Sequence, residues 1–293
     1  MSEIEIASPK SGLQAASSEL LIQVPAWSAY TWLRHGFSTR HGGISTVYQS
    51  EFSSESDLNL GWTKEDDPDN VAVNRLLFVA AATGTAATPL FTLRQIHSAI
   101  TLVVPEAASF PAFVNSNGRA IREADGFITA ASGALLGVQT ADCVPVLVAD
   151  TKNRVVAAFH AGWRGTSARI VEQGISQMVS EYGSHPEDMI AAVGPSIGPC
   201  CYTVGEEVHS SFMTHFAYGE LLFQKGPEAI LHLDLWEANR RQLLDSGIAP
   251  ASITVLAQCT GCTGLPSSRR YFSHRCEHGF TGRMMNVIGI DPA

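Results

Sequence analysis

The chain has 293 residues, of which 45% are hydrophobic and 16% are charged, so it can bury a large core in one domain or two. The formal net charge is −9, and no cluster of lysine or arginine is available to neutralise phosphates, which excludes a nucleic-acid partner. There is no run of about 18 apolar residues and no signal-peptide pattern, so we expect no membrane span and a cytoplasmic location. Six cysteines in a chain of this size do not resemble a disulfide framework, and reduced thiols are expected.

Taken in order, the polar residues 1–19 are expected to form a disordered arm, and residues 20–293 a single catalytic domain. A helix is predicted to begin near Pro68, with Val71, Leu76 and Phe78 on its buried face. After it, the segment PLFTLRQIHSAITLVV predicts two strands, with the polar RQIH sequence in the middle of the first. The alternation of that strand places Gln95 and His97 on the same side.

The segment at 134–166 organises the chain: apolar strand, turn, apolar strand, turn, apolar strand, then a glycine-rich step into a helix. Runs as apolar as VPVLVA and VVAAF are expected to be buried on both faces. Cys143 and His160 stand at the ends of two of these strands. Because the strands are neighbours, the two side chains can meet in one pocket.

Later elements are a helix capped by Thr166 or Ser167, an amphipathic helix over LHLDLWEANRRQLLDSGI that ends at Gly247, and strands over ASITV and near the C-terminus. Strands and helices alternate without a strict βαβ rhythm. The sequence therefore predicts an α+β (mixed α/β) domain, in which helices cover mixed β-sheets.

Three residues could form a metal site of His₂Cys type with one position left open: His97, Cys143 and His160. Zinc is the expected ion, since a catalytic zinc keeps three protein ligands and one exchangeable position, and copper is possible. The alternative is a buried cysteine and two strand-end histidines that make ordinary hydrogen bonds. Sequence separation alone does not decide between these interpretations.

Four further residues are candidates for substrate or phosphate contacts. Arg164 in GWRG is placed at a predicted helix N-terminus, and Arg40 lies in the STRHGG loop, so each could bind an anion or face solvent. Asp142 could orient a metal ligand or cap a turn. Gln95 is the candidate for a polar contact to a base or a ribose.

The remaining cysteines raise the question of a second metal. The pair Cys259 and Cys262, followed by HRCEH with Cys276, has the composition of a structural zinc site, but a CxxC at a strand end is also a common turn. Adjacent Cys200 and Cys201 are poorly disposed to bind one ion together and are expected to be structural.

Successive segments of the chain resemble one family over about residues 35–290, and TADC with HAGWRG is the most specific combination: HGFSTRHGG, DLNLGW, DDPDNVAVNR, RQIHSA, TADCVPVLVAD, FHAGWRGT, VGPSIGPCCYTVGEEV, CTGC and YFSHRCEHGFTGRM. This is the laccase-domain family, also called multicopper polyphenol oxidase, peptidoglycan editing factor and purine nucleoside phosphorylase. The resemblance implies one domain related to the cytotoxic-necrotizing-factor-like cysteine hydrolases. It also implies a zinc ion held by His97, Cys143 and His160.

The activities that the resemblance implies are phosphorolysis of adenosine, inosine, guanosine and methylthioadenosine, and adenosine deamination. Hydrolysis of UDP-muramoyl-serine precursors and copper-dependent phenol oxidation are also attributed to the family. The chain departs from the family pattern at residues 274–277, where HRCE replaces the usual Tyr-Arg-Arg-Asp.

None of the ten histidines has another two positions away, so the trinuclear copper cluster of a multicopper oxidase is not expected. A hydrolase with Cys143 as nucleophile and His160 as base competes with the zinc interpretation. The hypothesis that follows is a zinc-dependent purine nucleoside phosphorylase with adenosine deaminase activity, a monomer or homodimer, in which Arg40 and Arg164 attract phosphate.

Overall fold

A computed structural model describes residues 20–49, 56–264 and 269–292. The arm predicted at residues 1–19 lies outside these ranges. Within them, no helix combines the length and the apolar composition that crossing a membrane requires.

Two large sheets and one small sheet make up the β-structure. In spatial order, the five-stranded sheet consists of β1 (Leu21–Ile22), β2 (Leu33–Ser38), β15 (Met284–Ile290), β7 (Ala134–Thr140) and β4 (Leu90–Thr92). The six-stranded sheet consists of β14 (Ile253–Val255), β10 (Met189–Val193), β8 (Val144–Asp150), β9 (Val155–Ala161), β6 (Gly126–Thr129) and β5 (Thr101–Val103). The small sheet contains β11 (Thr203–Val204), β13 (Leu231–Leu233) and β12 (Phe223–Lys225), and β3 (His41–Ser45) stands apart.

The helices are α2 (Pro68–Thr83), α3 (Trp163–Ser167), α4 (Ile170–Tyr182), α5 (Glu206–His215) and α6 (Leu235–Asp245). Short 3₁₀ turns are η1 (Pro25–Ala29), η2 (Ala107–Ala112), η3 (Pro186–Asp188), η4 (Gly219–Leu222), η5 (Pro227–Ala229) and η6 (Pro250–Ser252). Parallel pairs (β4 with β7, β5 with β6, β10 with β14) occur beside antiparallel ones, which confirms the predicted mixed α+β class.

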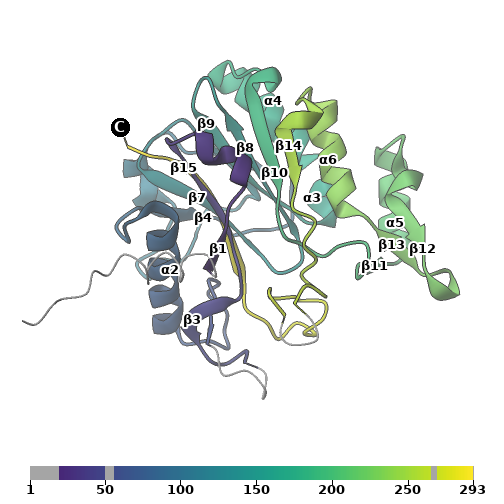
Figure 1. Ribbon diagram of the computed structural model, residues 1–293, viewed down its shortest axis with the longest axis horizontal. Coiled ribbons are helices and arrows are strands. Elements are labelled where there is room, and N and C mark those ends of the chain that lie inside the picture. Colours follow the sequence, from purple (N-terminus) through teal and green to yellow (C-terminus); the bar gives the residue numbers. More distant parts are fainter. Residues whose placement is uncertain (1–19, 50–55, 265–268, 293) are drawn as a thin grey trace, which may run out of the picture.

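The two large sheets pack face to face between helical layers. Alternate residues of β8 divide between two cores: Val146 and Val148 pack toward α4 and α6, whereas Leu147 packs with residues of the five-stranded sheet. On the other side, Phe78 of α2 packs against that sheet, and Figure 1 shows α2 opposite α4 and α6. Strands buried on both faces need apolar side chains at every position, which explains the uninterrupted runs of β8 and β9.

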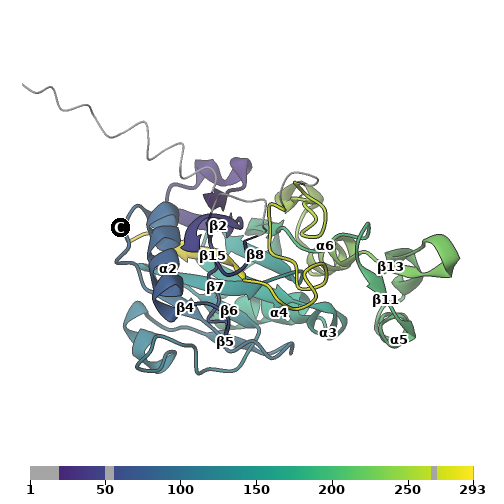
Figure 2. The ribbon, with the colours of Figure 1, turned by 90° about the horizontal axis from the view of Figure 1, so that it is seen from below.

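The small sheet and α5 extend from one side of this sandwich, as both views of the ribbon show (Figures 1 and 2). The chain leaves β10 to form this extension and returns through α6 to β14. The segments on either side of the extension therefore lie next to each other at the end of the β10–β14 pair.

The predicted strand–strand–strand–helix order at 134–166 is confirmed, but β7 belongs to the five-stranded sheet rather than to the sheet of β8 and β9. The helix that follows is interrupted, because Arg169, with a φ of 60°, separates α3 from α4. Thr166 and Ser167 therefore lie inside α3 and cap neither helix.

Two details of the helix predictions are wrong. Leu76 is 53% exposed, and the buried face of α2 uses Asn74 instead, whose amide donates to Ser45 Oγ and to the Asn59 carbonyl. The predicted helix at 231–248 begins later, because its first residues form β13 and Asp234 caps α6 by accepting from the Glu237 N–H.

Candidate metal centre

The antiparallel pairing of β8 with β9 brings Cys143 and His160 together. Pro145 is the register partner of His160, and Cys143 lies two residues before Pro145 in the turn that leads into β8. In an antiparallel pair the beginning of one strand and the end of the next share an edge. The predicted meeting of these two residues follows from that register.

His97 reaches the same edge from the loop between β4 and β5. The predicted strand through RQIH is wrong, because residues 95–99 lie outside any strand and His97 has a φ of 59°. Such a backbone conformation is uncommon for a side chain with a Cβ and needs support from its surroundings. The Asp125 carboxylate supplies it by accepting from the N–H groups of Ile96 (3.2 Å), His97 (3.0 Å) and Ser98 (2.7 Å).

Asp125 also positions the second histidine. Its Oδ1 lies 2.8 Å from Nδ1 of His160, and both side chains are buried. Burial opposes ionisation of this carboxyl, but the hydrogen bonds from His160 and Ser98 lower its pKa to about 2. An ionised Asp125 accepts a hydrogen bond from the Nδ1–H group of His160. The proton therefore stays on Nδ1, and Nε2 is left free as the ligand atom. Sequence reasoning missed Asp125, and an acidic residue just before a buried strand was the available signal.

The ligand atoms of His97, Cys143 and His160, which we call the mixed centre, all lie within 4.8 Å of one another. Cys143 Sγ is 3.9 Å from His97 Nε2. Zinc bound to sulfur at ~2.3 Å and to nitrogen at ~2.05 Å requires about 3.5–3.8 Å between these atoms. One thiolate and two imidazoles on this scale fit a zinc ion.

The electrostatics of the mixed centre favour a thiolate. Burial alone would raise the pKa of the Cys143 thiol, but the adjacent imidazoles of His160 and His97 lower it to about 6. Burial opposes the charge on His160, and the thiolate and Asp125 together raise the pKa of its imidazole to about 9. A bound metal ion would replace the proton of the hydrogen bond between His160 and the Cys143 thiolate.

The mixed centre opens into a cavity of about 590 Å³. Its lining combines apolar walls with three arginines and three histidines: Leu93, Gln95, His97, Gln139, Thr140, Ala141, Asp142, Cys143, His160, Trp163, Arg164, Ile197, Tyr202, Leu235, His274, Arg275 and Arg283. Among the described residues, neither Arg275 nor Arg283 forms an ion pair with a carboxylate. The sequence interpretation had not assigned Tyr202, Arg275 or Arg283 to the site.

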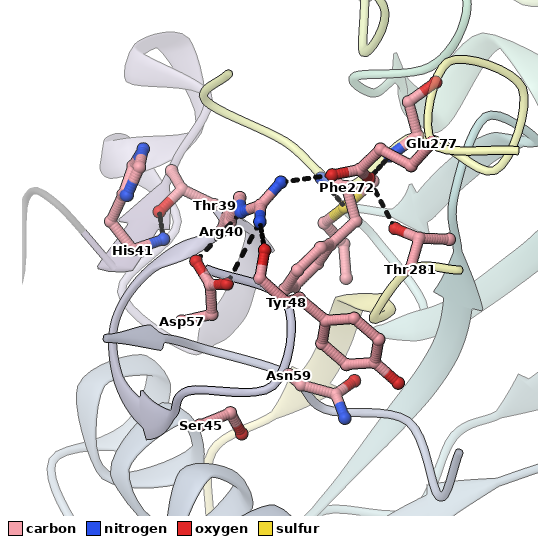
Figure 3. Close-up of polar contacts among 12 residues, drawn as sticks. Thr39, Arg40, His41, Ser45, Tyr48, Asp57, Asn59, Phe272, Glu277 and Thr281 are labelled. Atoms are coloured by element: carbon pink, nitrogen blue, oxygen red, sulfur yellow. Dashed lines mark hydrogen bonds and ion pairs between the residues drawn. The ribbon is translucent and has the colours of Figure 1, made fainter. Parts of the chain in front are cut away.

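Arg40 does not line this cavity. Its Nε donates to Asp57 Oδ1 at 2.8 Å, it also pairs with Glu277, and the residue is 7% exposed (Figure 3). Figure 3 shows the guanidinium enclosed by these carboxylates and the ring of Phe272. Because two anions already satisfy it, we do not retain Arg40 as a phosphate contact.

The other predicted contacts do reach the cavity, with different partners. Gln95 exchanges two 2.7 Å hydrogen bonds with the main chain of Gln139, so its amide joins the His97 loop to β7. Asp142 accepts from Thr260 Oγ1 at 2.6 Å and Ser273 Oγ at 2.7 Å. Arg164 is the most open of them, with 58% of its side chain exposed.

The second group of candidate metal ligands differs from the predicted one. Cys259 and Cys262 gather with Cys200 and Cys201, not with Cys276. His274 lines the cavity of the mixed centre instead. Adjacent Cys200 and Cys201 thus lie within reach of one point, which the sequence interpretation did not expect.

Comparison with known proteins identifies the family of the chain. Residues 34–291 match the family described as multi-copper polyphenol oxidoreductase laccase. The chain belongs to this family. A purine nucleoside phosphorylase of Deinococcus radiodurans is 38% identical over 256 residues, 87% of this chain and 88% of the relative.

Two further relatives are informative, one for its enzyme name and one for its fold. Adenosine deaminase RL5, from an unknown prokaryotic organism, is 34% identical over 238 residues, 80% of this chain and 87% of the relative. The crystal structure of hypothetical protein YfiH from Bacillus licheniformis has a TM-score of 0.81 at 31% identity, and the match covers 93% of this chain and 97% of that one. The family resemblance and the single mixed α+β domain are thus confirmed.

Proposed function

We propose that this protein catalyses phosphorolysis of purine nucleosides at the mixed centre, with zinc as its metal. The observation that carries the proposal is a three-ligand site that opens into a cavity large enough for a nucleoside and lined by three arginines. The name of the Deinococcus relative, at 38% identity over most of both chains, supports the same reaction.

His97, Cys143 and His160 would hold the ion, with Asp125 fixing His160 as the Nδ1–H tautomer. The bound ion would supply Lewis-acid stabilisation of negative charge at the open position. Copper fits less well: blue copper sites add a weak axial methionine to two histidines and a cysteine, and no methionine lines the described cavity.

Phosphate would bind between Arg164 and Arg275. Arg275 is oriented for this, since its Nη1 donates to the Thr203 carbonyl at 2.7 Å and its guanidinium stacks over Tyr202. Guanidinium groups match the planar, bidentate geometry of a phosphate. The walls formed by Leu93, Ile197 and Leu235 offer apolar contact to a purine ring.

In the reaction, a phosphate oxygen forms a bond to C1′ as the bond from C1′ to the purine nitrogen breaks. The electron pair of that bond leaves with the purine, which takes up a proton, and ribose 1-phosphate is the second product. The arginines hold the nucleophile beside C1′ and lower the entropic barrier to its attack.

Adenosine deamination is part of the same proposal, supported by the name of RL5. Water in place of phosphate would add to C6, and ammonia would leave to give inosine. The substrates inosine, guanosine and methylthioadenosine differ from adenosine at C6, at C2 or at the ribose, and the cavity volume would accommodate all of them.

A cysteine hydrolase is the second candidate, because Cys143, His160 and Asp125 form a nucleophile, base and orienting carboxylate in hydrogen-bonding sequence. Such an enzyme could open an amide or ester of a UDP-muramoyl-serine precursor. The thiolate would attack the carbonyl, and the amine or alcohol would leave with a proton from His160. Water would then hydrolyse the thioester, which releases the acid and restores the thiol.

The deciding experiment measures adenosine turnover with and without phosphate, before and after chelation of the metal, with products separated by chromatography. Adenine and ribose 1-phosphate formed only with phosphate and metal are expected. Inosine formed regardless of phosphate would identify the deaminase instead. Turnover of a muramoyl-serine precursor that survives chelation and stops on thiol alkylation would replace the proposal with the hydrolase.

A further inference from the structure

Four cysteines from two distant segments converge at the end of the β10–β14 pair. These strands are parallel, so the chain leaves both at the same edge of the sheet. The two exits continue side by side: Ser196 N–H donates to the Gln258 carbonyl, and Thr260 N–H donates to the Ser196 carbonyl. The first exit then turns through Cys200 and Cys201, and the second turns through Cys259 and Cys262.

The ligand atoms of these residues, which we call the cysteine cluster, all lie within 4.8 Å of one another. Cys200 Sγ and Cys262 Sγ are 3.7 Å apart. A tetrahedral zinc ion with four sulfurs at ~2.3 Å places neighbouring sulfurs about 3.8 Å apart, whereas a disulfide requires about 2.05 Å. The observed separation matches two ligands of one ion and is too long for a disulfide.

The backbone around the cysteine cluster is shaped for these sulfurs. Gly198 N–H donates to Cys259 Sγ at 3.3 Å, and such a bond favours a thiolate. In the CTGC turn, a Cβ on Gly261 would lie 3.0 Å from Cys276 Sγ and 3.1 Å from Cys201 Cβ. A side chain at this position would crowd Cys201 and Cys276, and glycine avoids that contact.

We propose that Cys200, Cys201, Cys259 and Cys262 bind a second zinc ion in a structural site. Four thiolates complete a tetrahedral shell, so this ion has no position for substrate or water. Binding releases the thiol protons to solvent and involves no redox step. The proposal stands whether or not the mixed centre is a phosphorylase.

The ion would stabilise the wall of the neighbouring cavity. Thr260, next to Cys259, donates to Asp142, and the Ile197 N–H donates to the Asp142 carbonyl at 2.9 Å. Asp142 directly precedes Cys143, the thiol of the mixed centre. Cross-linking the two loops would thus fix the turn that presents this ligand.

The test uses the His97→Ala variant, which removes one ligand of the mixed centre and leaves the cysteine cluster intact. After dialysis, elemental analysis should find one zinc ion per chain, and X-ray absorption should show only sulfur neighbours at ~2.3 Å. Adding Cys262→Ser should release that ion. Adding Cys276→Ser, a matched cysteine outside the cluster, should retain it.

Three results would overturn the proposal: a metal-free His97→Ala protein, nitrogen or oxygen ligands in its absorption spectrum, or equal zinc loss in the two cysteine variants. If Cys262→Ser does not fold, the absorption spectrum of His97→Ala still decides. Intact mass of freshly purified, denatured wild-type protein provides a separate check. Loss of two hydrogens with a Cys200–Cys262 cross-link would show a disulfide and contradict the zinc site.

Discussion

The mixed centre and the cysteine cluster lie on either side of the Asp142 turn, yet they differ in ligand number and in access to the cavity. The mixed centre has two imidazoles and one thiol, a carboxylate behind one histidine, and a cavity in front. The cysteine cluster has four sulfurs and lies outside the cavity lining. Three ligands with an open position suit catalysis, and four ligands suit structure. The comparison teaches that ligand number and access separate the two roles better than sequence spacing does.

The largest expected effect is the loss of activity when a ligand of the mixed centre is removed. Cys143→Ala should remove the metal from the mixed centre and lower kcat/KM for adenosine phosphorolysis by about 10³-fold, because the ion contributes several kcal/mol to transition-state stabilisation. Metal analysis and product chromatography measure both. Cys276→Ala is the control and should keep both metal and activity. Full activity in Cys143→Ala would rule out a role for the mixed centre.

Thiol reactivity should separate the two centres next. In metal-stripped protein, the imidazoles hold the pKa of Cys143 near 6, whereas burial and the neighbouring thiols raise the pKa of Cys200 to about 12. Cys143 should therefore be mostly thiolate at neutral pH, and its alkylation rate should rise with pH and level off above about pH 7. Cys200, although more exposed, should react about 10²-fold more slowly at pH 7, since the higher intrinsic nucleophilicity of a high-pKa thiol offsets only part of its smaller thiolate fraction.

Mass spectrometry of iodoacetamide-labelled peptides over a pH series measures both rates. If Cys200 reacts as fast as Cys143 at neutral pH, the proposed electrostatic difference between the centres is wrong.

Asp125→Asn should weaken zinc binding at the mixed centre by about 10- to 100-fold, because the amide no longer fixes the His160 tautomer. The cysteine cluster should keep its zinc. Zinc release to a competing chelator gives the affinity. Asp150→Asn is a matched control: Asp150 is a buried carboxylate at the far end of β8 that accepts from the Lys152 and Asn153 N–H groups. Equal weakening by both variants would point to general destabilisation rather than ligand positioning.

The smallest effect concerns the anion. Arg164→Ala should raise KM for phosphate about fivefold, or ~1 kcal/mol, with kcat little changed, since a side chain that is 58% exposed acts through water. Initial rates at varied phosphate measure it. Arg154→Ala, which removes a guanidinium stacked on Trp32 at the β8–β9 turn, should leave KM unchanged. An unchanged KM in Arg164→Ala would contradict a phosphate contact by Arg164 and would assign phosphate binding to Arg275 and Arg283.

Much of the fold could be predicted from the sequence where hydrophobic pattern and burial coincide. The apolar runs of β8 and β9 indicated strands buried on both faces, and their adjacency placed Cys143 and His160 together. The same pattern could not show that β7 leaves for the other sheet, because an apolar strand fits either sheet equally well.

The misassigned site residues depend on contacts between distant parts of the chain. Arg40 is satisfied by Glu277, 237 positions away, and Cys200 meets Cys262, 62 positions away. Asp125 was missed because its role depends on the His97 loop, whose N–H groups its carboxylate accepts from. Local composition indicates which chemistry is available, whereas register and loop closure decide which groups meet.

The central claim is that the mixed centre carries metal-dependent phosphorolysis, and restoring zinc to the metal-stripped enzyme tests it most directly. Ribose 1-phosphate formation from adenosine and phosphate is followed as zinc is added to wild-type protein and to Cys143→Ser. We predict that wild-type activity rises from near zero to a plateau, whereas Cys143→Ser stays inactive. Equal activity before and after zinc, or recovery of the variant to the wild-type rate, would contradict the account.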